Sequence, residues 1–299
     1  LLLWDGSNAG EIIDKHPRGF APSTTAILKN ISSNNQRYCF YAMKYLERFI
    51  RSNTVGMGVP HVDGDYLKSL RFITPSNADQ ERIANYLDHK ISVIDSILDS
   101  KDELISLLYE QRVGIISQAV TKGLYSDSAM KDCGVKWLGQ IPATWQVLTN
   151  HQLFAERNIK CTESDAVLLS VTKHLGVILQ SQAEELNLAT VAPAETTEGY
   201  KVVHKGDLVM NIMRAKDGSY GVSEYDGVIS PAYCIYYPRQ EINPQYLYYL
   251  FKTPMYMEIF KNYSTGIAEH RMRLYPVNFF KIPAVVPPLE EQTAIVAYL

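Results

Sequence analysis

The most restrictive feature of this sequence is a segment that occurs twice. The residues from Phe72 to Leu87 recur from Ala284 to Leu299, at an offset of 212. The matched positions are Pro75 with Pro287, Asp79 with Glu291, Gln80 with Gln292, Ile83 with Ile295, and Tyr86-Leu87 with Tyr298-Leu299. Each copy predicts an edge strand that stops at its proline and is followed by a helix. A repeat of so long a period predicts a tandem duplication of one structural unit.

The similarity between the two copies extends upstream in a weaker form. Residues 37–41 match 245–249, and residues 52–56 match 262–266. By the offset of 212, the first copy lacks roughly 65 residues at its front, and the second stops just after its helix begins. Because the apolar opening run Leu1–Trp4 predicts a strand already under way, we expect the chain to be a piece of a longer protein.

Between the two copies, Ala78 to Lys122 predicts one long helix. The segment has no proline and no glycine before Gly114. Its apolar residues follow a heptad spacing, which Lys101 and Arg112 interrupt. The seam residues are Leu87, Ile91, Ile94, Leu98, Ile105, Leu108, Ile115 and Ala119, and the stripe is broadened by Ile97, Leu104, Leu107, Ile116 and Val120. A helix of about 65 Å suits a coiled-coil spacer better than the core of a small domain, although an ordinary buried helix is the alternative.

The segment Glu290–Leu299 predicts the start of a second such helix, because duplicated units carry duplicated helices. Two helices of this kind lying antiparallel would hold two globular units a fixed distance apart. The broad apolar stripe also predicts a further partner surface on the central helix.

Composition is typical of a packed soluble protein, with 46% hydrophobic and 20% charged residues. The longest apolar runs are far shorter than the ~20 residues of a membrane span, and no signal peptide opens the chain, so we expect a cytoplasmic protein. The cysteines predict neither a zinc site nor a disulfide framework, because no C-x-x-C pair occurs among them. They are Cys39, Cys133, Cys161 and Cys234.

Charge alone argues against a nucleic-acid partner, because the formal net charge is −3 and phosphate contacts need Lys and Arg. The distribution is uneven, however. Residues 1–75 carry nine Lys/Arg against six Asp/Glu, whereas residues 76–122 carry five against eight. Residues 251–281 hold five Lys/Arg against two Glu, a local excess that could face phosphates. Any basic surface is therefore expected outside the central helix.

A phrase after the central helix identifies a family. The run from Met130 to Trp145 reads M-K-D-C-G-V-K-W-L-G-Q-I-P-A-T-W. It closely resembles the specificity subunits of type I restriction-modification enzymes, which carry M-K-D-S-G-x-x-W-L-G-x-I-P-x-x-W there, with Cys133 standing in place of the usual serine. Similar phrases are Leu3–Gly10, Ser170–Gly176, Met213–Ala215, His270–Tyr275 and Pro287–Gln292. Their order, together with the duplication, makes the match specific over nearly the whole chain.

The resemblance implies an α+β fold in which two pseudo-repeated mixed α/β target recognition domains are joined by a long coiled-coil spacer helix. Five regions follow from it: the C-terminal part of the first recognition domain (1–77), the central conserved helix (78–122), a linker (123–142), the second recognition domain (143–288) and the start of a second conserved helix (289–299).

The resemblance also implies a non-catalytic subunit. Each recognition domain would read one half of a bipartite double-stranded DNA site, and antiparallel helices would set the gap. Two modification subunits would pack on those helices and methylate adenine with S-adenosylmethionine, and restriction subunits would join to translocate and cut. We therefore expect no cofactor in this chain itself.

Candidate DNA contacts lie in predicted loops. The run Ser264–Arg273 combines hydroxyls, a glycine and two arginines; arginine can donate two bonds to guanine, and a surface ion pair is the alternative. Other candidates follow the predicted strand Val167–Val171, flank the turn at Asp217-Gly218, which could be a bare hairpin tip, or occupy the permissive loop Gly6–Gly10. The full set is Asn8, Lys173, His174, Arg214, Lys216, Ser219, Tyr220, Ser264, Thr265, His270, Arg271 and Arg273, with Lys15, Arg18 and His61 as weaker candidates.

Signals for catalysis are poor. Asn243-Pro244-Gln245-Tyr246 resembles the N-P-P-Y motif of adenine methyltransferases, but a turn that opens a helix explains it better. Aromatic residues on the two predicted helices are expected in the core, namely Tyr38, Phe40, Tyr41, Tyr45, Tyr246, Tyr248 and Tyr249. Two other functions stay open: the recognition part of a fused adenine methyltransferase-nuclease, and a coiled-coil scaffold that binds no DNA.

Overall fold

The computed structural model describes residues 1–14, 19–125, 127–188, 196–267 and 271–299. These residues form a mixed helix and strand structure that divides into two compact units, Leu1–Ile105 and Ser106–Leu299. The predicted α+β class is confirmed. Among the residues described, no helix is long and apolar enough to cross a membrane.

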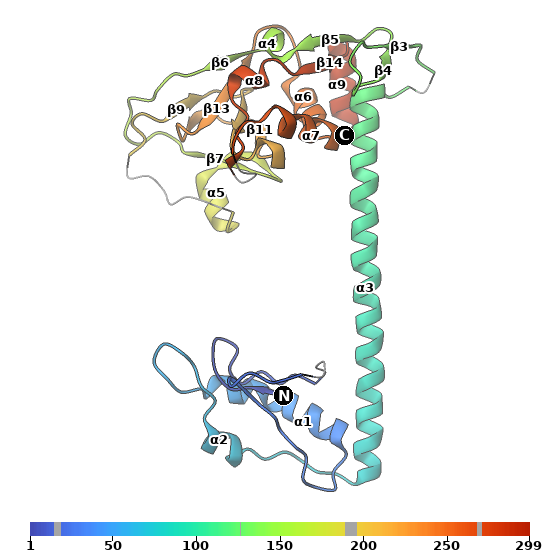
Figure 1. Ribbon diagram of the computed structural model, residues 1–299, viewed down its shortest axis with the longest axis vertical. Coiled ribbons are helices and arrows are strands. Elements are labelled where there is room, and N and C mark those ends of the chain that lie inside the picture. The colour runs from blue at the N-terminus through green and yellow to red at the C-terminus, as the bar shows by residue number, and fades with distance from the viewer. Residues whose placement is uncertain (15–18, 126, 189–195, 268–270) are drawn as a thin grey trace. The chain divides into compact units, whose positions relative to one another are not determined.

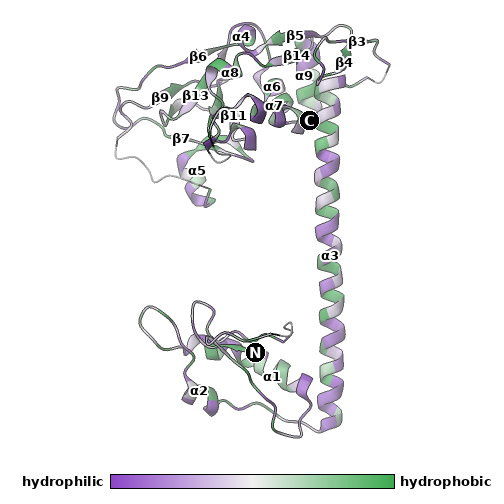
Figure 2. Ribbon diagram, viewed as in Figure 1, coloured by the Kyte–Doolittle hydropathy of each residue, from purple (hydrophilic) through white to green (hydrophobic). Residues whose placement is uncertain are grey.

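One helix, α3 (Asn77–Lys122), runs through 46 residues and contributes to both units (Figure 1). This confirms the single long helix that the heptad spacing predicts. Figure 2 shows hydrophobic and hydrophilic residues alternating along it. Its large apolar side chains are mostly exposed: Ile83, Tyr86, Ile91, Val93, Ile94, Ile97, Leu98, Leu104, Ile105, Leu107, Leu108, Tyr109 and Ile115. The alternative of an ordinary buried helix is therefore wrong.

The second unit is built on a four-stranded antiparallel sheet in the order β11-β10-β13-β6. Its strands are β6 (Phe154–Arg157), β10 (Leu208–Asn211), β11 (Tyr220–Val222) and β13 (Tyr233–Pro238). Helices α6 (Pro244–Phe251), α7 (Pro254–Tyr263) and α8 (Pro276–Phe279) supply aromatic side chains to one large core. That core also contains Ala119 and Val120 from the end of α3, and Ile295 from α9 (Leu289–Tyr298).

Smaller elements complete the second unit. Two-stranded sheets pair β3 (Met130–Asp132) with β4 (Gln140–Pro142), β5 (Gln146–Thr149) with β14 (Pro283–Val286), β7 (Leu169–Thr172) with β8 (Gly176–Leu179), and β9 (Lys201–Val203) with β12 (Gly227–Ile229). The short helices are α4 (Asn150–Leu153), α5 (Gln180–Glu185) and the 3-10 turn η1 (Ala215–Asp217).

The first unit contains β1 (Leu2–Leu3), β2 (Thr25–Ala26), α1 (Gln36–Ser52), α2 (Gly64–Ser69) and the first part of α3. The strand expected at residues 72–74 is absent, and this prediction is wrong. In the second unit the equivalent strand β14 pairs with β5. In the first unit none of the described strands pairs with residues 72–74, so this stretch of backbone has no strand partner.

The sequence repeat is also a structural repeat, as two buried glutamines show. Gln80 accepts a hydrogen bond from the Asn35 amide at 2.8 Å and donates to the Pro75 carbonyl at 2.8 Å. Gln292 likewise accepts from the Asn243 amide at 2.8 Å and donates to the Pro287 carbonyl at 2.9 Å. Asn35 and Asn243 are the N-caps of α1 and α6. Each glutamine therefore joins the start of one helix to the proline before the next.

Strand pairing extends the repeat to the first residues, at an offset of 208. Leu2 and Leu3 pair with Ala26 and Thr25, as Met210 and Asn211 pair with Cys234 and Tyr233. The bridge between Leu2 and Ile12 matches the pair Met210 and Tyr220. The offset grows to 210 because one helix, α1, stands where the second unit has α6 and α7. It reaches 212 across the next loop, which spans 55–61 in the first unit and 265–273 in the second.

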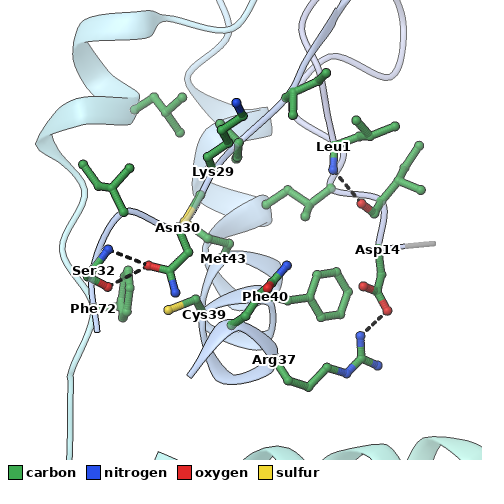
Figure 3. A pocket seen from close by; sticks show the side chains of 17 residues that line it. Leu1, Asp14, Lys29, Asn30, Ser32, Arg37, Cys39, Phe40, Met43 and Phe72 are labelled. Atoms are coloured by element: carbon green, nitrogen blue, oxygen red, sulfur yellow. Dashed lines mark hydrogen bonds and ion pairs between the residues drawn. The ribbon is translucent and has the colours of Figure 1, made fainter. Parts of the chain in front are cut away.

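The first unit has an open groove of about 830 Å³ beside α1 (Figure 3). Residues 27–30 form part of its wall. By the offset of 208 they match Ile235–Pro238, the part of β13 that pairs with β6. Residues 27–30 form no strand in the first unit, whereas their counterparts pair with β6 in the second.

Candidate nucleic-acid interface

Three segments of the second unit that the sequence singled out for DNA contact come together. They are the turn between β7 and β8 (173–175), the connection between β10 and β11 (212–219), and the segment 264–273. The ammonium of Lys252 donates to the carbonyl of Lys173 at 2.7 Å and to that of Gly218 at 2.5 Å. The Leu274 amide donates to the Ile212 carbonyl at 2.9 Å. Lys252 thus joins the first two segments, and the residue that directly follows the third segment is bonded to the second.

The turn between β7 and β8 exposes Lys173 and His174. Thr172 closes the turn from beneath, because its hydroxyl accepts from the Leu175 amide at 3.0 Å and donates to the Gly176 carbonyl at 3.3 Å. Gly176 has φ +68°, which favours glycine. Both candidate side chains are thus held at the tip of a well-defined hairpin.

The connection between β10 and β11 is a hairpin tip, with Gly218 at φ +84° after η1. Arg214 is exposed and Lys216 is half-buried. Ser219 and Tyr220 are buried, which removes both from the accessible candidates. The Tyr220 hydroxyl donates to the Phe251 carbonyl at 2.6 Å, and burial raises the pKa of this hydroxyl. The sequence-based prediction extended this loop one residue too far, because β11 already begins at Tyr220.

The segment 264–273 is closed by two reciprocal backbone hydrogen bonds between Thr265 and Arg273, of 3.0 and 2.9 Å. Thr265, Arg271 and Arg273 are exposed. Neither arginine forms an ion pair with another residue that the structure describes. Ser264 is buried and donates to the Phe260 carbonyl at 2.6 Å, so its role is to end α7 rather than to face DNA. His270 lies outside the described residues.

The first unit carries the same two loops as the second. Residues 4–10 match 212–218 at the offset of 208, so exposed Asn8 occupies the position of Lys216. Reciprocal bonds of 2.9 and 2.7 Å between Val55 and His61 match those between Thr265 and Arg273. The His61 ring also contacts the Asp5 carboxylate. Lys15 and Arg18 lie outside the described residues.

A glycine allows each of the second loops to close. A Cβ on Gly56 would lie 2.6 Å from the Val59 carbonyl oxygen, and one on Gly266 would lie 2.5 Å from the Arg271 carbonyl oxygen. Both distances are shorter than real contacts allow. Any side chain at either position would therefore push the returning strand of its loop away.

The sequence Asn243–Tyr246 opens α6, as expected. The Asn243 side chain caps the helix, and the Tyr246 hydroxyl donates to the carbonyls of Val120 at 3.0 Å and Val285 at 3.1 Å. Core packing is observed for Tyr246 but is wrong for Tyr45, which is 64% exposed. The other aromatic residues of the two clusters are partly buried, namely Tyr38, Phe40, Tyr41, Tyr248 and Tyr249.

Lys252 is the residue that sequence reasoning missed at this interface. It was counted in the basic run 251–281 but not as part of a site. The only signal was its position at the end of an aromatic helix, because nothing in the sequence indicates which carbonyls its side chain reaches. Among the described residues, no group of three or more His, Cys, Asp or Glu could hold a metal ion, and the four cysteines are free.

Comparisons with known proteins point in one direction. Residues 13–105 match the family model described as type I restriction modification DNA specificity domain. The chain is 27% identical, over 99% of its own length and 70% of the relative's, to the type I restriction enzyme MjaVIII specificity subunit of Methanocaldococcus jannaschii.

Two solved structures share the fold. One is the HsdS subunit of Thermoanaerobacter tengcongensis, with a TM-score of 0.50, 14% identity, and coverage of 88% of this chain and 61% of that one. The other comes from a study of complex assembly and conformational transition of the type I R-M system, with a TM-score of 0.61, 15% identity, and coverage of 89% and 62%. The chain thus spans about three fifths of each of these solved chains.

Proposed function

We propose that this chain is a specificity subunit of a type I restriction-modification system and that its two units each read one half of a bipartite double-stranded DNA site, which its similarity to such subunits supports. The chain would supply the sequence preference of a larger complex and no catalytic group. The relatives support neither a fused methyltransferase-nuclease nor a scaffold that binds no DNA.

The observation that carries this proposal is the recurrence of one pair of loops in both units. In each, a hairpin connection (4–10 or 212–219) lies next to a loop closed by reciprocal backbone bonds (55–61 or 264–273). The Val62 amide donates to the Trp4 carbonyl as the Leu274 amide donates to the Ile212 carbonyl, both at 2.9 Å. Two copies of one surface on a chain are suited to two separate half-sites.

The exposed side chains on these loops have the chemistry of base and phosphate contact. In the second unit they are Lys173, His174, Arg214, Thr265, Arg271 and Arg273. Arginine can donate two bonds to the O6 and N7 atoms of guanine, and lysine neutralises phosphates. In the first unit Asn8 can make two bonds with adenine. The two units therefore differ in the bases that their side chains suit.

The exposed apolar stripe of α3 supports roles for the helix in spacing and docking. A partner helix, begun by α9 and running antiparallel to α3, would cover part of the stripe and fix the gap between half-sites. Modification subunits would bind the remainder, bring S-adenosylmethionine and methylate adenine, and a restriction subunit would join them. The complex would act in the cytoplasm.

The test is a map of methylated adenines in a methylation-free host that expresses this chain together with a modification subunit. We expect one interrupted motif, which disappears when this chain is left out. An assembled complex that produces no new methylation would contradict the proposal.

A further inference from the structure

The side chain of Lys252 joins two turns of the second unit. Lys252 follows the last residue of α6. Its ammonium donates to the carbonyls of Lys173 and Gly218, at 2.7 and 2.5 Å, and these belong to the β7–β8 turn and the β10–β11 connection. It also lies over the rings of Tyr220 and Tyr248, 4.9 and 5.2 Å from their centroids. One ammonium thus contacts the backbones of two hairpins.

This placement is unfavourable for a lysine unless the bonds compensate for lost water. Desolvation, with a smaller effect from Lys173, lowers the pKa of Lys252 to about 8. No described carboxylate forms an ion pair with it, so carbonyl oxygens and aromatic faces are its partners. A lysine that only solubilised the surface would extend into water instead.

The two hairpins also touch at a pair of glycines close to these turns. A Cβ on Gly221 would lie 2.7 Å from the Gly176 Cα atom, so the strands approach too closely for a side chain. The contact between Gly176 and Gly221 sets the distance between β8 and β11. Lys252 sets the distance between the β7–β8 turn and the β10–β11 connection. Exposed Lys173 and His174 lie on one turn, and Arg214 lies on the other.

We propose that Lys252 is a positioning residue for DNA reading, because it fixes the spacing between the two turns whose side chains face the half-site of the second unit. The inference rests on the proposed function and names a determinant of specificity within it. Lys252 itself contacts no base. It holds the contacting side chains at a spacing that matches one base sequence.

The first unit contains a lysine at the matched position that forms different contacts. Lys44, at the offset of 208, donates to the Ile12 carbonyl at 3.0 Å and pairs with Glu47 at 2.6 Å. Lys44 therefore connects the backbone at Ile12 to α1, the helix that contains both Lys44 and Glu47, and does not connect two turns to each other. The bridging of two turns is therefore a feature of the second unit, where the β7–β8 hairpin supplies one of them.

The experiment compares methylated motifs produced by the full-length chain and its variants, each assembled with the modification subunit. Lys252→Met and Lys252→Gln remove the double contact, and Lys252→Arg keeps donors for both carbonyls. Lys160→Met is the charge-matched control, because exposed Lys160 lies in the same unit and its backbone bridges to Lys201 of β9. Thermal unfolding of each variant identifies any that fail to fold. If Lys252→Met fails to fold, Lys252→Gln provides the test.

We expect Lys252→Met and Lys252→Gln to lose about tenfold in discrimination at one or more positions of one half-site, with the other half-site unchanged. Lys252→Arg should restore the preference, and Lys160→Met should behave as the wild type. A folded Lys252→Gln variant that methylates the wild-type motif with unchanged preference would overturn this inference and leave the proposed function standing. A wild-type complex with no motif would overturn the proposed function and, with it, this inference.

Discussion

The two units of the chain have matching strand pairs and hydrogen bonds. They differ in how many strands complete their sheets. Gln80 and Gln292 share two bonds to the backbone, Gln80 adding a third to the Asn34 side chain, and the strand pairs at Leu2 and Met210 match residue for residue. Yet the wall at residues 27–30 borders an open groove, whereas Ile235–Pro238 pairs with β6. The arrangement of the two loops therefore depends on local hairpins and caps and not on a complete sheet.

The largest expected effect comes from lengthening α3, which should change the gap between the half-sites without changing the bases that the two units read. Insertion of seven residues near Leu104 lengthens α3 by about 10 Å, or about three base pairs of DNA. We expect the methylated motif to gain about that many unread positions while both half-sites keep their bases. The matched control inserts seven residues after Gly134, in a loop outside α3. An unaltered gap in the first variant would exclude α3 as the spacer.

A second prediction compares the two glutamines. Gln292→Leu leaves the Asn243 amide and the Pro287 carbonyl without their partner, and we expect a loss of about 2–5 kcal/mol in the free energy of unfolding. Gln80→Leu should cost less, because the first unit is more open. Urea unfolding of both variants gives the two values. A larger loss for Gln80→Leu would show that the first unit is the better packed one.

The smallest expected effect is the pH dependence of the free energy of unfolding that Lys252 gives to the second unit. The pKa of Lys252 is about 8 in the folded chain, below its ordinary value of 10.5. The unfolded chain therefore binds more protons between these values, and the free energy of unfolding should rise as pH increases from about 8. Buried tyrosines oppose this trend near pH 10, and the Cys39 and Cys234 thiols, whose pKa burial raises, oppose it at lower pH. The measurement is therefore the difference between the wild type and Lys252→Met over pH 8–9.5. Lys252→Met should remove the rise, and a rise of equal size in that variant would assign it to another group.

The long helix and the duplication could be predicted from sequence, because heptad spacing and matched prolines are local signals. The exposure of Lys173, Arg214 and Arg271 in loops was also predictable. Burial of Tyr220 and Ser264 was not, because strand limits and helix ends depend on tertiary contacts that a short polar run does not show. The contacts of Lys252 depend on hairpins 34 and 79 residues away, which no spacing rule connects.

The central claim is that both units present one reading surface, each to its own half-site. The most direct measurement is the methylated motif of two double variants of the full-length chain, Arg271→Ala with Arg273→Ala and Asn8→Ala with His61→Ala. We expect the first to relax one half-site and the second to relax the other, with about 1–3 kcal/mol of lost discrimination for each base contact removed. If both double variants altered the same half-site, or neither altered the motif, the account of two matched reading surfaces would be contradicted.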